Sequence, residues 1–202
     1  GYIAKLVRKG YKIAICEQME DPKLAKGLVK REIIRRVTPG TVVEASMLDE
    51  NRNNFLGCVF AVQGGIGVCF ADITTGEVYA TGSDNWQDIA SELGRFAPRE
   101  VLVGGTAATA ESFHSFLKER LEALIEPMPE ECFDPQRAAA RVMQHFCIED
   151  FDAAGLTGLP QTVQCLGGLL DYLGETQQAS LAALSHLQVY HQGQYMELDL
   201  IA

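Results

Sequence analysis

The side chains with the clearest chemical potential are four cations close together near the start of the chain. They lie in the segment DPKLAKGLVKRE, which holds the densest positive charge in the sequence: Lys23, Lys26, Lys30 and Arg31. Cations at this spacing can neutralise phosphates of a nucleic-acid backbone, a contact that gives affinity without sequence information. A solvated loop with uneven charge would have the same composition. Both hypotheses remain open at the level of sequence.

Asp72 is the natural candidate for metal-dependent catalysis. Nucleases that use two metal ions need several carboxylates converging on one site. The strand predicted over Phe55 to Val62, which would lie beside Asp72, contains neither Asp nor Glu. The run DITTGE is instead typical of a turn in which Asp and Thr oxygens accept hydrogen bonds from nearby backbone N–H groups. We therefore expect Asp72 to be structural, and a nuclease is the least favoured function.

Other catalytic patterns are missing from the sequence. It contains no phosphate-binding G-x-x-x-x-G-K-[ST] loop, no H-E-x-x-H and no nucleophile elbow. His145 lies near Cys147, but one such pair is too small for a metal site, and a helix surface is the better interpretation. The six cysteines occur singly in apolar stretches without C-x-x-C spacing, which predicts buried free thiols. We expect no catalytic residue, metal or cofactor in this chain.

Charge divides the chain into two unequal parts. Residues 1–46 hold ten basic and five acidic side chains, a net of +5, and the remainder holds seven and twenty-two, a net of −15, which sum to −10. Such asymmetry predicts two units with different neighbours. With 47% hydrophobic and 22% charged residues, the composition is that of a globular protein. No apolar run approaches the roughly 20 residues of a membrane span, so we expect no membrane association.

Hydrophobic periodicity predicts most of the elements. The first unit should contain a helix over Tyr2–Arg8, two strands and a polar link after Thr41. The second should open with three antiparallel strands joined by Gly-containing turns. The predicted strands lie at 11–17, 31–37, 55–62, 66–73, 77–81 and 100–103, with a short one near residue 125.

Four amphipathic helices are predicted in the second unit. Their apolar positions recur with helical spacing from Trp86 to Phe96, from Phe113 to Leu124, from Pro135 to Phe146 and from Val163 to Leu173. Asp134 is suited to the N-cap of the third, with proline in its first turn. In the fourth, Gly167-Gly168 weakens the helix or marks a close contact. The order predicts an α/β fold, a mixed sheet with helices on both faces, as in ribonuclease H-like domains.

The segment from Ala4 to Thr41, AKLVRKGYKIAICEQMEDPKLAKGLVKREIIRRVTPGT, closely resembles the MutS family of bacterial DNA mismatch repair proteins. The elements AICEQ, DP and VTPGT occur in the family's order. NNFL, FADITTGEV and YMELD also resemble family segments, so the resemblance extends over nearly all 202 residues. It implies that residues 1–43 are the C-terminal part of a mismatch-recognition domain, 44–52 a linker, 53–192 a ribonuclease H-like connector domain and 193–202 the start of a core domain.

The resemblance also implies what the whole protein does. Family members recognise mispaired and unpaired bases, probing them with a Phe-x-Glu motif, and signal through an ATPase domain; neither the motif nor a P-loop occurs here. We expect an excised, non-catalytic fragment of a cytoplasmic, homodimeric bacterial protein, whose ATP and magnesium bind outside this chain. Its predicted partners are mismatched DNA, in the whole protein, and MutL, which the family's connector domain binds.

We place the MutL-docking candidates on the polar face of the helix predicted over Pro135–Phe146. This face is opposite the apolar stripe that contains Ala138 and Val142, and arginine is favoured in interface cores. An ordinary solvated helix would carry the same pattern. The docking candidates are Gln136, Arg137, Arg141 and Gln144.

Overall fold

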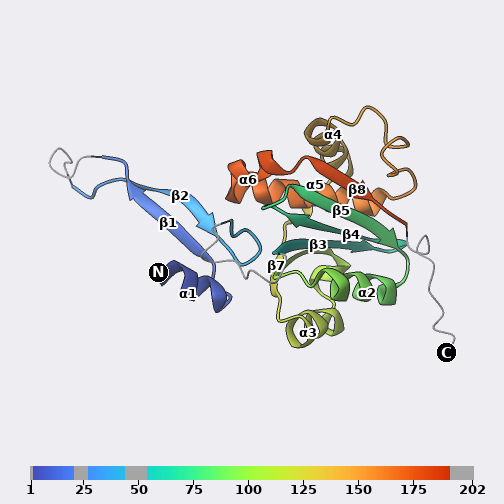
Figure 1. The fold of residues 1–202 in the computed structure, drawn as a ribbon, viewed down its shortest axis with the longest axis horizontal. Helices are drawn as coiled ribbons and strands as arrows, with labels where there is room; N and C mark the ends of the chain where they lie inside the picture. Colours follow the sequence, from blue (N-terminus) through green and yellow to red (C-terminus); the bar gives the residue numbers. More distant parts are fainter. Residues whose placement is uncertain (1, 21–26, 44–53, 192–202) are drawn as a thin grey trace.

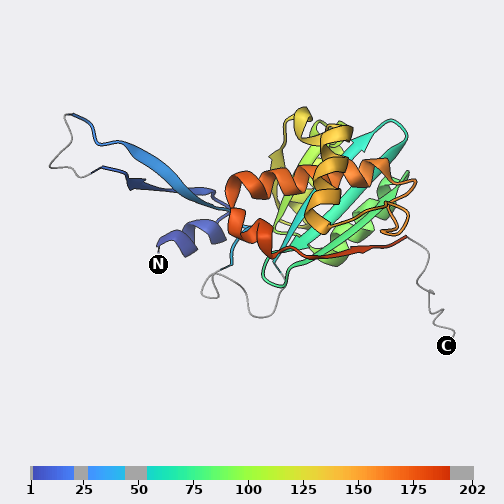
Figure 2. The same cartoon turned by 90° about the horizontal axis from the view of Figure 1, so that it is seen from above.

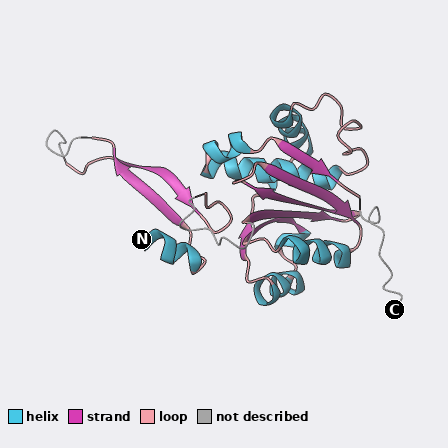
Figure 3. Cartoon of the chain, in the orientation of Figure 1, coloured by secondary structure: helices cyan, strands magenta, loops and turns pink. Residues whose placement is uncertain are grey.

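The fold is described from a computed structural model, which covers residues 2–20, 27–43 and 54–191. It consists of a two-stranded ribbon with a short helix, followed by a six-stranded sheet between two layers of helices (Figures 1 and 3). The predicted linker over 44–52, the predicted start of a core domain over 193–202, Lys23 and Lys26 lie outside the described residues. The linker and domain boundaries therefore stay predictions.

The N-terminal unit is a helix and an antiparallel ribbon. Its elements are α1 (Tyr2–Arg8), β1 (Ile13–Gln18) and β2 (Arg31–Val37). The strands pair from Ile13↔Val37 to Gln18↔Arg31, with an irregularity after Ile15. In Figure 1 the ribbon projects away from the large sheet, with the end of β1 and the start of β2 farthest out. Most of its side chains are exposed, and only a small core around Val7, Val37 and Val42 is buried.

The large sheet has the order β7-β6-β3-β4-β5-β8. Its strands are β3 (Phe55–Val62), β4 (Gly65–Asp72), β5 (Glu77–Ser83), β6 (Glu100–Gly105), β7 (Leu124–Pro127) and β8 (His186–Val189). The first three form an antiparallel meander, whereas β6, β7 and β8 each pair in parallel with a neighbour. A meander followed by parallel β6 and β7 on the β3 side of the sheet is the predicted ribonuclease H-like arrangement, and the mixed sheet is confirmed.

Helices cover both faces of this sheet. One layer contains α2 (Trp86–Phe96) and α3 (Glu111–Arg120), and the other contains α4 (Pro135–Phe146), α5 (Pro160–Thr176) and α6 (Gln178–Ala183) (Figure 2). Short 3-10 turns occupy Thr106–Ala108 and Glu130–Phe133. Alternation along β3 explains the two layers, because Leu56, Cys58 and Phe60 belong to the α5 core while Phe55, Val59 and Ala61 belong to the α2–α3 core.

Several local predictions are confirmed. α4 has the predicted bounds, and the Asp134 carboxylate accepts a hydrogen bond from the Arg137 backbone N–H at 2.9 Å as its N-cap. Gly167 and Gly168 mark a close contact, since a Cβ on Gly167 would lie 2.4 Å from Ala138 Cβ and one on Gly168 would lie 2.4 Å from the Phe133 ring.

Among the described helices, none combines the length and apolar composition that a membrane crossing requires.

One prediction needs correction, and two elements were missed. The helix predicted from Phe113 to Leu124 ends at Arg120, because residue 122 adopts a left-handed conformation (φ 52°) and Leu124 begins β7 beside β6. α6 and β8 were not predicted. The alternating exposure of β8 reflects its position at the edge of the sheet, and its four residues are too short for a clear pattern.

Candidate interdomain clasp and docking surfaces

A buried carboxylate joins the N-terminal unit to the large sheet. Glu100, the first residue of β6, is fully buried. Its Oε2 accepts a hydrogen bond from the Gly40 backbone N–H at 3.0 Å, and its Oε1 accepts one from the Tyr172 hydroxyl of α5 at 2.7 Å. The Lys12 ammonium lies 3.9 Å from the same Oε1 and also forms an ion pair with Glu126 of β7. One carboxylate thus contacts three separate elements.

The partner of Glu100 is the tight turn at Thr38–Thr41. The Thr41 backbone N–H donates to the Thr38 carbonyl at 3.1 Å, and the Thr41 hydroxyl accepts from the Thr38 backbone N–H at 3.1 Å. This turn needs glycine at residue 40, because a Cβ there would lie 2.8 Å from the Glu100 Cβ and 3.0 Å from Leu56. This turn lies within the VTPGT segment of the family resemblance, and its physical role is to bind the Glu100 carboxylate.

Gln177, just after α5, holds the other end of the same segment. Its Nε2 donates to the Thr41 carbonyl at 2.9 Å and to the Arg36 carbonyl at 3.2 Å. Together with the contacts of Glu100, these bonds tie the end of β2 to β6 and α5. We call this set of residues the clasp: Lys12, Thr38, Gly40, Thr41, Glu100, Tyr172 and Gln177.

Glu100 was not among the predicted site residues. It occurs in the predicted strand EVLV, and the one sequence signal of its burial is that it is a charged residue at the start of a strand that is otherwise fully apolar. Burial, followed by the negative charge of Glu100 and its hydrogen bond, raises the pKa of Tyr172 well above its usual value. Tyr172 is therefore a neutral hydrogen-bond donor at neutral pH.

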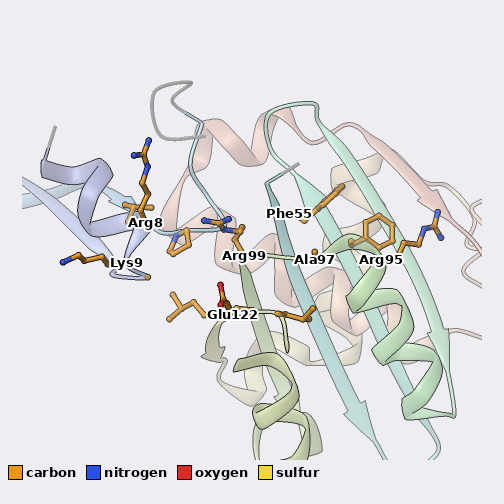
Figure 4. Close-up of a pocket in the computed structure, with 14 residues that line it drawn as sticks. Arg8, Lys9, Phe55, Arg95, Ala97, Arg99 and Glu122 are labelled. Atoms are coloured by element: carbon orange, nitrogen blue, oxygen red, sulfur yellow. The ribbon is translucent and has the colours of Figure 1, made fainter. Parts of the chain in front are cut away.

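A cleft of about 850 Å³ separates the end of α1 from the large sheet. Among its lining residues are Arg8, Lys9, Arg95, Arg99 and Glu122 (Figure 4). In Figure 4, Arg99 and Glu122 lie in the middle of the cleft, whereas the Lys9 side chain points away from it. Arg95 forms an ion pair with Glu92 at 3.5 Å, and the four cations of the lining do not converge on one point.

The structure describes two of the four predicted DNA-backbone cations, Lys30 and Arg31. Lys30 forms an ion pair with Glu32 at 2.7 Å, and both side chains are at least half exposed. Arg31 is exposed at the outer end of β2. The structure therefore places two of the four candidates on the projecting ribbon and leaves their role a prediction.

The predicted docking residues share one helix but differ in their surroundings. Gln136, Arg137 and Gln144 are exposed on α4, whereas Arg141 is half-buried and forms an ion pair with Asp171 of α5. Arg137 also lies 3.8 Å from this carboxylate. A groove of about 630 Å³ begins beside Arg141 and Gln144, touches α5 at Leu170 and continues to α6 and the residues after it. The polar face is thus partly fixed to α5 and borders a hollow.

Asp72 has the structural role that was expected. Its Oδ1 accepts hydrogen bonds from the Thr74 backbone N–H at 2.9 Å and from the Thr74 hydroxyl at 2.5 Å. Within the described ranges, the only group of three or more potential metal ligands is made of cysteines. No cluster of carboxylates surrounds Asp72 in that part of the chain, so the geometry gives the nuclease hypothesis no support.

His145 contacts the backbone and not a cysteine. Its Nε2 lies 2.8 Å from the Leu184 carbonyl oxygen.

The cysteine prediction was partly wrong. All six are free, but only Cys58, Cys69 and Cys165 are buried, whereas Cys16 and Cys147 are exposed. The three buried thiols also lie together in the core, although they are far apart in the sequence.

Comparison with known proteins finds a matching family model for each of the two units. The family model for MutS domain I matches residues 1–46, and the model for MutS domain II matches residues 54–188. The chain belongs to the MutS family. The clasp therefore joins the segment of domain I to domain II.

Relatives of the chain are named DNA mismatch repair protein MutS. The protein from Symbiobacterium thermophilum is 40% identical over 201 residues, and the one from Lachnoclostridium phytofermentans is 39% identical over 204 residues. Each alignment covers 98% of this chain, but only 23% and 21%, respectively, of the relative. The protein from Methanococcoides burtonii is 38% identical over 203 residues, and the alignment covers 99% of this chain and 23% of the relative. The chain thus spans less than a quarter of these MutS relatives.

Proposed function

We propose that this part of MutS is a non-catalytic connector, which transmits the position of the mismatch-recognition domain to the rest of the protein and provides a docking surface for MutL. The observation that carries the proposal is the clasp. A buried carboxylate with three partners from separate elements resists rotation of one unit against the other better than an exposed contact would. In the whole homodimeric protein, mismatched DNA and ATP would bind largely outside these residues.

The docking surface in this proposal is the exposed face of α4 with the adjoining groove. Exposed Gln144 lines a partly apolar hollow, and exposed Arg137 adds a charged group on the same helix, the mixture found in non-obligate interfaces. Arg141 is a supporting residue in this scheme, since its ion pair with Asp171 fixes the guanidinium beside the groove.

Charge reversal on α4 should weaken MutL binding at least tenfold, about 1.4 kcal/mol. We would titrate the chain with MutL by calorimetry and compare the wild type with the double variant Arg137→Glu, Gln144→Glu. Arg141 is left unchanged because it is half-buried and forms the closer of the two ion pairs with Asp171, whereas Arg137 is exposed. The matched control is Ser115→Glu, Lys118→Glu, which makes the same change of charge on exposed positions of α3. Equal affinities for all three proteins, or no saturable binding at all, would count against docking by this chain.

The projecting basic ribbon favours a second candidate function, contact with the DNA backbone. Lys30 and Arg31 are exposed at its outer end. If three phosphates are neutralised, the logarithm of the binding constant should fall with log salt at a slope of about −2.7.

The double variant Lys30→Gln, Arg31→Gln should reduce the slope to about −0.9, because each lost phosphate contact removes about 0.9. Fluorescence anisotropy with a fully paired duplex at several salt concentrations measures this. Lys118→Gln, Arg120→Gln on α3 is the control with equal loss of charge. An unchanged slope in the ribbon variant would remove Lys30 and Arg31 from the DNA interface.

A further inference from the structure

Three thiols from distant parts of the sequence meet in the core beneath α5. Cys58 of β3 and Cys69 of β4 face each other directly across the antiparallel ladder, and Cys165 of α5 packs over them. The three sulfur atoms lie within 4.8 Å of one another, and Sγ of Cys69 and Sγ of Cys165 are 3.5 Å apart. All three residues are fully buried.

This spacing is close to that of a single ion held by three sulfurs. A thiolate binds a soft ion at about 2.3 Å, so sulfurs that share one ion lie within about 4.6 Å of each other. Thiolates select soft, thiophilic ions over hard ones. Among the described residues, no His, Asp, Glu or fourth Cys joins the group within the same limit, so a tetrahedral zinc site lacks one protein ligand.

The net charge of the ion together with its three thiolates determines which soft ion fits a buried site. Three thiolates carry a charge of −3, so zinc or copper(I) would leave a net negative site, and burial of a net charge is costly. A trivalent ion bound by three thiolates would leave no net charge. The core cluster that holds these three cysteines includes the apolar side chains of Leu56, Leu166 and Leu169.

We propose that Cys58, Cys69 and Cys165 form a buried trithiol site for trivalent arsenic, taken up as arsenite. The exchange is As(OH)₃ + 3 R–SH → As(SR)₃ + 3 H₂O. Three As–O bonds break, three As–S bonds form, and each thiol proton leaves with a hydroxide as water. Arsenic stays trivalent, so no oxidant or reductant is needed, and the product is neutral. The bound ion links β3, β4 and α5.

Binding should stabilise the fold and should be slow. A ligand bound only to the folded state raises stability, and about 5 °C in Tm is expected at arsenite a hundred times its dissociation constant. Because the sulfurs are fully buried, arsenite must wait for local opening of α5 from the sheet. Refolding from urea in the presence of arsenite should give the same complex without that delay.

The test uses the full chain with the other thiols removed by Cys16→Ser, Cys132→Ser and Cys147→Ser. After phosphine reduction and refolding with arsenite, the desalted protein should retain one arsenic per chain, with three sulfur and no oxygen neighbours by X-ray absorption. Adding Cys69→Ala in the same background should abolish the retained arsenic and the rise in Tm. Cys58→Ala serves as the second variant, and circular dichroism establishes that each variant is folded.

Three results would overturn the site: no retained arsenic in the background protein, equal retention after Cys69→Ala, or a sulfur count below three. Preferential retention of zinc from an equimolar mixture would also overturn it, because the charge argument would then have selected the wrong ion. These readouts are independent of MutL and DNA, so they test the thiol site apart from the proposed function.

Discussion

Replacing Glu100 with alanine is expected to lower the free energy of unfolding by about 3 kcal/mol. The substitution leaves the Tyr172 hydroxyl and the Gly40 backbone N–H without their buried acceptor, and each such group costs about 1–3 kcal/mol. It also removes the carboxylate near Lys12. Urea denaturation followed by circular dichroism measures the loss, and proteolysis should cut the N-terminal unit faster because the clasp holds it against the sheet.

The clasp also predicts how stability depends on alkaline pH. The pKa of Tyr172 is raised in the folded state above its unfolded value of about 10, first by burial and then by Glu100. The stability that this group contributes is fully present below pH 10 and is lost as pH rises above it, since the unfolded state then releases the proton more readily. Tyr172→Phe and Glu100→Ala should each show a smaller loss above pH 10 than the wild type.

Conservative variants separate the charge of Glu100 from its shape. Glu100→Gln keeps an acceptor for one partner but places an NH₂ group against the other donor, so an intermediate loss is expected. Glu119→Ala on the exposed face of α3 should change stability by no more than about 0.5 kcal/mol. A loss below 1 kcal/mol for Glu100→Ala, with proteolysis unchanged, would show that the clasp does not hold the two units together.

Local periodicity was sufficient for the elements that decide the fold. The apolar runs of β3 and β4 predict a hairpin buried on both faces, and the spacing of Trp86, Ile89, Leu93 and Phe96 predicts α2 within its observed bounds. α3 was predicted too long because Leu124 fits a helical pattern. In the fold its backbone instead joins the parallel ladder beside β6, a long-range contact that outweighs local preference.

The same reason explains what was missed at the sites. Glu100 contacts Gly40 and Tyr172 across 60 and 72 positions of sequence, and Cys165 is 96 positions from Cys69. No pattern within a helix or strand carries such pairings. The basic segment and the polar face of α4 were visible in the sequence because they are local, yet for that reason they resemble any solvated surface. Local pattern thus identified candidate surfaces, whereas the buried sites required the topology.

Replacing Gly67 with alanine should be at least as damaging as loss of the clasp, about 3 kcal/mol. A Cβ on Gly67 of β4 would lie 2.3 Å from the carbonyl oxygen of Gln161 and 2.5 Å from the Thr162 backbone nitrogen. These are backbone atoms at the start of α5, so no side-chain rotation relieves the overlap. The helix would have to move away from the sheet, and overpacking of this kind costs about 1–3 kcal/mol or more.

The Gly67→Ala variant therefore tests whether the first turn of α5 has to lie directly on the sheet. Gly82 of β5 also packs closely against this turn of α5. The Thr162 hydroxyl donates a hydrogen bond to the Thr81 carbonyl at 3.0 Å. Gly94→Ala is the matched control, because that glycine lies in α2 with open space around it, and alanine should stabilise the helix by up to about 1 kcal/mol. If both variants show equal urea midpoints, α5 does not depend on this contact. If only Gly67→Ala is destabilised, displacement of α5 should also weaken the clasp, since Tyr172 and Gln177 lie at the far end of the same helix.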